Sequence, residues 1–144
     1  MDIQRYLDNF FKLKDIVFVP GTRVIQNLFD NDQSLLTNQL YFFCDPIRRE
    51  IKRSASGVAT GQKATISFAF VVYSDLDMPY FNEVPNTENK YTKNIEPIII
   101  KWNLLIKELA CKLDVSNENY TDVLNIKDIN FDGIIGDITF ETYE

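Results

Sequence analysis

The segment Ile66–Tyr73 constrains the fold of this chain most strongly, because its side chains alternate with a period of two. Ile66, Phe68, Phe70 and Val72 occupy one face, and Ser67, Ala69, Val71 and Tyr73 occupy the other. A second apolar run, Leu40–Cys44, precedes it and stops at Asp45-Pro46. Two β-prone segments joined by a polar, turn-forming stretch predict a long β-hairpin. Because its second face is also apolar, we expect partial cover there from a helix or a neighbouring subunit.

The stretch between these two segments is basic, although the protein as a whole is acidic. Residues 48–64 hold five basic side chains and one acid, Glu50, so they carry a charge of +4. The whole chain carries −6, which leaves −10 for the remainder. Small residues dominate 54–61, where we expect a mobile tip. The sequence therefore predicts a projecting, cationic hairpin loop over residues 48–64.

Helical periodicity appears at two other places. Apolar residues recur at helical spacing within Asp2–Leu13, with Asp2 placed to cap the helix. A wider apolar stripe predicts a long helix over Ile95–Leu113. Residues 75–93 are polar and read as an extended arm, and Ile134–Tyr143 alternates as a closing strand.

These elements predict one α+β domain over residues 1–144. We expect a mainly antiparallel sheet formed by Leu40–Ile51, Thr65–Tyr73 and Ile134–Tyr143. The sheet packs against the one long helix, and the N-terminal amphipathic helix lies at its side or on a neighbour. A chain of 144 residues is long enough to bury a core of this kind.

The residue types needed for most catalysis are missing. The chain contains no histidine, which excludes the histidine-dependent nucleophile systems and removes the commonest metal ligand. Cys44 and Cys111 stand in apolar settings and are expected to be small buried hydrophobic residues. We therefore expect no enzyme activity, no cofactor and no metal site. No apolar run approaches the roughly 18 residues that a membrane span needs, so no membrane partner is expected.

Two short motifs partly match ligand-binding loops. Gly57–Lys63 is similar to a phosphate-binding loop, but its glycine spacing is one residue short and a predicted strand follows it. Asp128–Gly133 fits the first half of a calcium loop, yet Thr139 stands where a bidentate glutamate is needed. The alternative for Asp128–Gly133 is a tight acidic turn leading into the last strand.

The order of elements resembles that of a known family. A strand ends in Tyr41–Pro46, a second strand runs through Ile66–Asp75, and a helix through Ile98–Leu105 precedes a closing strand. This order is similar to that of the small tail-terminator or neck proteins of tailed bacteriophages, in particular phages that infect Bacteroidetes. The resemblance implies a structural virion protein that forms a ring at the head–tail junction or in the tail. It would be made in the bacterial host cytoplasm and bind its own copies and adjoining portal, neck or tail proteins.

Surface residues in the loop and the arm are the candidates for partner binding. The basic loop can pair with the acidic body of another copy, or it is simply solvated surface. Non-specific proximity to DNA is a further possibility, and the alternative function is a non-viral adaptor that binds an acidic protein. The candidate residues are Arg48, Arg49, Lys52, Arg53 and Lys63 in the loop, and Asp77, Tyr80, Phe81 and Tyr91 in the arm.

Overall fold

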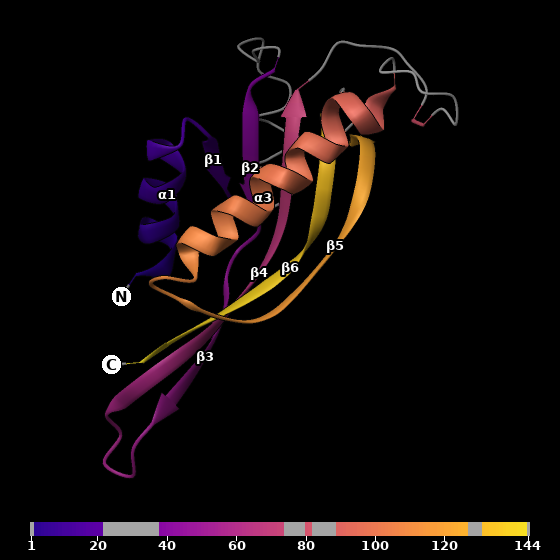
Figure 1. Cartoon of the computed structure of the whole chain (residues 1–144). Coiled ribbons are helices and arrows are strands. Elements are labelled where there is room, and N and C mark those ends of the chain that lie inside the picture. The colour runs from indigo at the N-terminus through magenta and orange to yellow at the C-terminus, as the bar shows by residue number, and fades with distance from the viewer. Residues whose placement is uncertain (1, 22–37, 74–79, 82–88, 127–130, 144) are drawn as a thin grey trace.

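The computed structural model describes residues 2–21, 38–73, 80–81, 89–126 and 131–143, and the side chains of all of these except 125 and 126 (Figure 1). Within them the chain forms a six-stranded, mostly antiparallel sheet with two helical segments on one face. The predicted α+β class, the mainly antiparallel sheet, the long helix and the N-terminal helix are confirmed.

Helix α1 spans Ile3–Leu13. The backbone N–H of Arg5 donates to the Asp2 side chain at 3.2 Å, which is the expected N-cap. Ile3, Leu7 and Phe11 form its buried stripe, which packs beside the first strand. The second helix, α3, spans Glu96–Leu109 and continues a π-helical turn, η1, at Tyr91–Ile95. No helix among the described residues is long and apolar enough to cross a bilayer.

The strands follow the order β1-β2-β4-β6-β5, and β3 pairs with β4 outside that path. Only β1 and β2 run parallel; the remaining pairs are antiparallel. Strand β4 is long because its second half pairs with β2 and its first half with β3. The strands are β1 Val17–Pro20, β2 Leu40–Cys44, β3 Arg48–Arg53, β4 Ala59–Tyr73, β5 Asp114–Ile126 and β6 Phe131–Tyr143.

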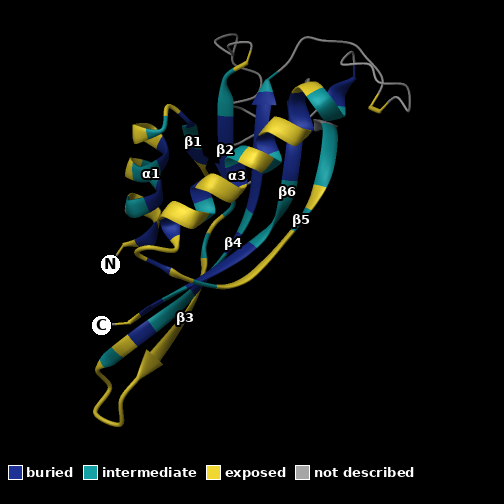
Figure 2. Ribbon diagram, in the orientation of Figure 1, coloured by how far each residue is buried: buried dark blue, intermediate teal, exposed yellow. Residues whose placement is uncertain are grey.

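The main core lies between the helices and the sheet and is rich in aromatic rings. Trp102 of α3 stacks on Phe68 with ring centroids 4.5 Å apart. Phe42 of β2 stacks on Phe11 of α1 at 4.3 Å, so one strand residue links both helices to the sheet. Figure 2 shows this buried layer along the inner sides of α1 and α3. Trp102 is therefore a core residue, as its place in the apolar stripe indicates.

The opposite face of the sheet is also buried at one end. Tyr41, Phe43, Ala69, Val71 and Phe131 form a second cluster away from the helices. Both helices contribute to the first cluster only. These side chains are buried within a single chain, and neither the helix nor the neighbouring subunit that we expected as cover belongs to the cluster.

Several predicted boundaries were wrong. The strand expected over Leu40–Ile51 is two strands, β2 and β3, and β4 begins at Ala59 instead of Thr65. Strand β5 was missed, and β1 parallel to β2 was not expected. The long helix begins earlier and ends earlier than predicted, at Leu109, after which a turn leads directly into β5.

Strand β6 passes very close to its neighbours at two glycines. A Cβ atom on Gly136 would lie 1.9 Å from the Asn119 carbonyl oxygen, and one on Gly133 would lie 2.2 Å from that of Phe70. No side chain fits at such distances, so glycine is required where the backbones of β5, β6 and β4 approach each other. Figure 1 shows that β6 curves along its length, from the body of the protein toward the C-terminus.

Candidate interaction surface

A three-stranded ribbon projects from the body of the protein. It consists of Arg48–Arg53 of β3, residues 59–65 of β4 and residues 139–143 of β6, with a turn at residues 54–58; we call it the finger. The finger extends beyond α1 and α3 in Figure 1. All six residues of β3 are exposed, as Figure 2 shows. Most of the range predicted to be a loop is therefore strand.

The tip of the finger is a closed turn held by local hydrogen bonds. The Ser54 N–H donates to the Val58 carbonyl at 2.8 Å, and the Gly57 N–H donates to the Ser54 carbonyl at 2.9 Å. Gly57 has φ +87°, a conformation that favours glycine. The Arg53 guanidinium donates to the Gly57 carbonyl at 3.0 Å. Since Gly57–Lys63 leads into a strand, it lacks the helix N-terminus that a phosphate loop needs.

The finger's positive charge is only partly neutralised within the chain. The ammonium groups of Lys52 and Lys63 lie 3.9 Å and 3.7 Å from the same carboxylate oxygen of Glu141. Among the described residues, no carboxylate forms an ion pair with Arg48 or Arg49. All five basic residues that were predicted to bind a partner thus lie on the finger. The charges of Arg48 and Arg49 are not neutralised by an ion pair with any described carboxylate.

The pairing register assigns the side chains of β3 to faces. Arg49 lies opposite Ala64, which belongs to the core cluster on the helix side of the sheet. The register shifts between Lys52 and Arg53, where β4 has one extra residue, Thr60, and β3 has none. Because β3 keeps its own alternation, Arg49, Ile51 and Arg53 lie on the helix side. Lys52 lies on the other side, together with Lys63 and Glu141.

The arm residues form a separate group at the start of the long helix, at the end of α3 away from the finger (Figure 1). The Tyr80 hydroxyl donates to the Asp122 carboxylate of β5 at 3.0 Å, and the Tyr91 N–H donates to the Tyr80 carbonyl at 2.8 Å. The Tyr91 ring meets those of Tyr80 and Phe81 edge-on. Partial desolvation, followed by the hydrogen bond to Asp122 and its charge, raises the pKa of the Tyr80 phenol.

The predicted arm is not one extended segment. Tyr91 belongs to η1, so the arm expected over residues 75–93 overlaps a helical turn. Asp77 lies outside the described residues, as do 75–76, 78–79 and 82–88. The structure therefore brings Tyr80, Phe81 and Tyr91 together but does not join them to the finger.

Sequence reasoning missed a buried ion pair. The Lys90 ammonium lies 3.1 Å from one Asp132 carboxylate oxygen and 3.2 Å from the other, and the Asn94 amide donates to the same carboxylate at 2.9 Å. Lys90 and Asp132 are almost completely buried. Asp132 is one of the oxygen ligands that the calcium-loop motif suggested, and here its carboxylate faces a lysine. Residues 128–130 lie outside the described residues, and within the described residues no cluster of acidic, cysteine or histidine side chains could hold a metal ion.

Strand β5 presents the opposite charge to the finger. Its acids are Asp114, Glu118 and Asp122, and it contains no basic residue. Glu118 lies opposite Ile138 and Asp122 opposite Ile134, and both isoleucines belong to the helix-side core. The Trp102 indole N–H donates to the Glu118 carboxylate at 2.8 Å, which fixes that side chain on the helix side.

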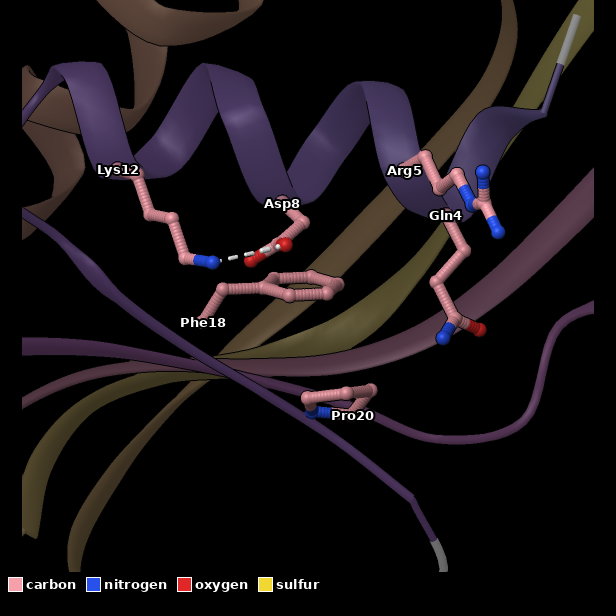
Figure 3. Close-up of a pocket in the computed structure, with 6 residues that line it drawn as sticks. All are labelled: Gln4, Arg5, Asp8, Lys12, Phe18 and Pro20. Carbon is pink, nitrogen blue, oxygen red and sulfur yellow. Dashed lines mark hydrogen bonds and ion pairs between the residues drawn. The ribbon is translucent and has the colours of Figure 1, made fainter.

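A shallow groove lies between α1 and β1 (Figure 3). Its volume is about 300 Å³, and its walls are Gln4, Arg5, Asp8, Lys12, Phe18 and Pro20. The Lys12 ammonium and the Asp8 carboxylate, one turn apart on α1, pair at 3.0 Å along the helix wall of the groove, as the dashed line in Figure 3 shows. Among these lining side chains, no nucleophile lies beside a base, which is the arrangement that nucleophilic catalysis uses.

The two cysteines differ in environment, which corrects the expectation that both are buried. Cys44 is buried, and desolvation followed by the nearby Asp45 charge raises its pKa to about 12. Cys111 is exposed at the end of the long helix, where its thiol lies near the Lys107 carbonyl. The helix ends at Leu109, before Cys111 could enter the buried stripe.

This difference predicts selective labelling. At pH 8, a thiol reagent such as 5,5′-dithiobis(2-nitrobenzoate) should modify one thiol per native chain quickly and the second only after unfolding. Cys111→Ser should abolish the fast reaction, whereas Cys44→Ala should leave it intact. Rapid native reaction of two thiols would contradict the burial of Cys44.

The raised pKa of Cys44 also makes the stability of the protein depend on pH. Burial raises the pKa of Cys44 in the folded protein, so its neutral thiol contributes stability below the pKa of the unfolded chain. That contribution is lost as the pH rises toward 12.

No protein-family model, curated protein or solved structure matches this chain.

Proposed function

We propose that this protein is a structural subunit of a tailed bacteriophage, assembled into an oligomeric ring at the head–tail junction or in the tail. The order of elements in the sequence suggests this family. The partners are other copies of the chain and adjoining portal, neck or tail proteins. We propose no catalytic role, and place the protein in the virion after synthesis in the host cytoplasm.

The exposure of the finger is the observation that carries the proposal. An isolated two- or three-stranded ribbon buries little surface and gains little stability by itself. In this chain, none of the β3 residues is buried, and the apolar Ile51, Val58 and Tyr143 are 45%, 61% and 67% exposed. A projecting ribbon with these properties is well suited to be covered by another protein.

The distribution of charge supports self-association. The finger is basic on β3, and the far edge of the sheet, β5, is acidic. Contact between two different patches on identical subunits is heterologous, and it generates a closed ring when the rotation between subunits closes. Exposed Leu13, Ile100 and Leu104 on the helix layer provide a further apolar surface for an adjoining protein.

The alternative is an adaptor that binds an acidic protein through the same finger. Arg48 and Arg49, which form no ion pair with the described carboxylates, favour this function as well. The two proposals differ in oligomeric state. A ring protein associates with itself, whereas an adaptor stays monomeric until its acidic partner is present.

Replacing Arg48, Arg49, Lys52 and Arg53 with serine should abolish self-association with little effect on folding. These side chains are exposed, so their loss should change the free energy of unfolding by no more than about 1 kcal/mol. Size-exclusion chromatography with light scattering should give a discrete oligomer for the wild type and a monomer for the variant. Negative-stain images should show rings only for the wild type.

The control is the variant in which Lys101, Lys107 and Lys112 are changed to glutamine, because these substitutions remove positive charge from helix α3 and the turn after it instead of from the finger. That variant should assemble normally. A wild-type protein that stays monomeric at every concentration, and binds an acidic protein instead, would replace the ring proposal with the adaptor.

A further inference from the structure

We propose that strand β3 of one copy pairs with strand β5 of the next copy, so that the sheet continues from subunit to subunit. This inference rests on the self-association proposed above and specifies which surfaces meet. Among the described strands, β3 pairs only with β4 and β5 only with β6. Each therefore presents a row of backbone groups that has no strand partner among the described residues, and such edges are templates for β-pairing.

The two edges have compatible positions and directions. Residues 61–65 of β4 pair with β3 on one side and with β6 on the other, so β3 and β5 lie at opposite edges of the sheet. Strand β3 is antiparallel to β4, and β5 runs in the same direction as β4 because both are antiparallel to β6. When a second copy lies beside the first in the same orientation, the β5 of one copy runs antiparallel to the β3 of the other. The helices of both copies then lie on the same side of the continuous sheet.

Charge complementarity selects a second copy of this chain as the occupant. Strand β3 carries four bases and one acid, a net +3, whereas β5 carries three acids and no base, a net −3. On the helix side, Arg49 and Arg53 are four residues apart, as are Glu118 and Asp122. Opposite charges on directly facing residues stabilise a strand pair, and like charges destabilise it.

These spacings define one antiparallel register. When Arg49 faces Asp122 and Arg53 faces Glu118, Ile51 faces Tyr120 between the two ion pairs. Ile51 is half-exposed in the single chain and Tyr120 is partly buried, so both gain apolar cover. A shift by two residues in either direction places Ile51 opposite a carboxylate, and a shift by one moves the side chains to the wrong face.

The Glu118 and Asp122 carboxylates can still accept hydrogen bonds from arginine in this register. Glu118 already accepts from Trp102, and Asp122 accepts from Tyr80. An ionised carboxylate offers about four acceptor positions, so each can also bind an arginine. The existing hydrogen bonds hold both carboxylates on the helix side, where Arg49 and Arg53 arrive.

Cysteine cross-linking tests the register directly. In a Cys111→Ser background, the double variant Ile51→Cys/Tyr120→Cys should form disulfide-linked multimers under mild oxidation, seen as a ladder on non-reducing gels. Facing residues in a strand pair have Cβ atoms about 4.5–5.5 Å apart, close to disulfide distance. The control Ile51→Cys/Thr121→Cys has its thiols on opposite faces and should give far less cross-linking.

Charge reversal tests the same contact in solution. Arg49→Glu/Arg53→Glu should be monomeric, because its β3 then faces two acids, and Glu118→Arg/Asp122→Arg should be monomeric for the converse reason. Mixing the two should restore assembly, since each β3 then finds a β5 of opposite charge on the other variant. If the β5 variant fails to fold, the Arg49→Glu/Arg53→Glu variant and the cross-link still decide the matter.

The outcomes separate this inference from the proposed ring. If the wild type is oligomeric but Arg49→Glu/Arg53→Glu still assembles and no cross-link forms, the β3–β5 pairing is wrong and the ring proposal stands. The β3–β5 pairing is also wrong, and the ring proposal stands, if Arg49→Glu/Arg53→Glu still assembles and loses only its binding to DNA or to an acidic protein. A wild type that never self-associates overturns both proposals.

Discussion

Asp132→Ala is expected to lower the free energy of unfolding by about 3–5 kcal/mol, because it removes a buried carboxylate that forms an ion pair with the buried Lys90 ammonium. The Asp132 and Lys90 side chains are 0% and 4% exposed, so the ion pair is shielded from solvent in the native protein. The substitution also removes the acceptor of the Asn94 amide. Urea denaturation followed by circular dichroism measures the change as a lower midpoint.

Two controls isolate the cause of this loss. Lys90→Met/Asp132→Leu removes both charges and should recover most of the lost stability, because a buried ion pair is often replaced by apolar residues without cost. Asp8→Ala breaks an ion pair of similar length, 3.0 Å, on the surface of α1, and should cost less than about 1 kcal/mol. If Asp132→Ala costs no more than Asp8→Ala, the pair is not buried in solution.

The parts of the fold that sequence reasoning predicted correctly are those with strong local signals. Helix α1 has a capping aspartate and an apolar stripe within eleven residues, so its identity does not depend on distant contacts. The hairpin strands β2 and β4 are equally clear, because β2 is a short continuous apolar run and the second half of β4 alternates between the two faces of a sheet. The five basic residues, which are close together in the sequence, all lie on the finger, and their role in binding a partner stays a prediction.

Strand β5 was missed because its stability comes from pairing, and its composition gives little sign of it. The segment Asp114–Ile126 is rich in asparagine and acids, residues that are depleted in strands. Among the described strands it pairs only with β6, and most of its described side chains are exposed, so polar residues are tolerated. The first half of β4 was assigned to a loop for a similar reason. Ala59–Gly61 consists of small residues, but Ala59 and Gly61 pair with β3, and from Gly61 onward β4 also pairs with β6.

The Lys90–Asp132 pair was invisible for a different reason. The two residues are 42 positions apart, and nothing local to either indicates the other. The acidic residues around Asp132 instead matched half of a calcium loop, which is a local pattern. A buried lysine at the start of a helix signals an acidic partner only after the fold brings β6 beside it.

Trp102→Ala should have an effect as large as that of Asp132→Ala, lowering the free energy of unfolding by about 3–5 kcal/mol. The indole is 1% exposed and packs against Phe68, Phe42 and Phe70, so its removal leaves a cavity at the centre of the main core. Chemical denaturation must be followed by far-ultraviolet circular dichroism, because Trp102 is the one tryptophan of the chain and the variant loses its fluorescence.

Trp102→Phe separates the packing of the ring from its hydrogen bond. It keeps an aromatic ring in the stack but removes the N–H that binds Glu118, so it should cost clearly less than the alanine variant. Glu118 is exposed, and water can replace the lost donor. The indole joins the core to the acidic edge of β5, which means that the phenylalanine variant should release the Glu118 carboxylate while leaving the fold intact. If Trp102→Ala costs less than about 1 kcal/mol, the ring does not fill the core and the packing of α3 on the sheet is wrong.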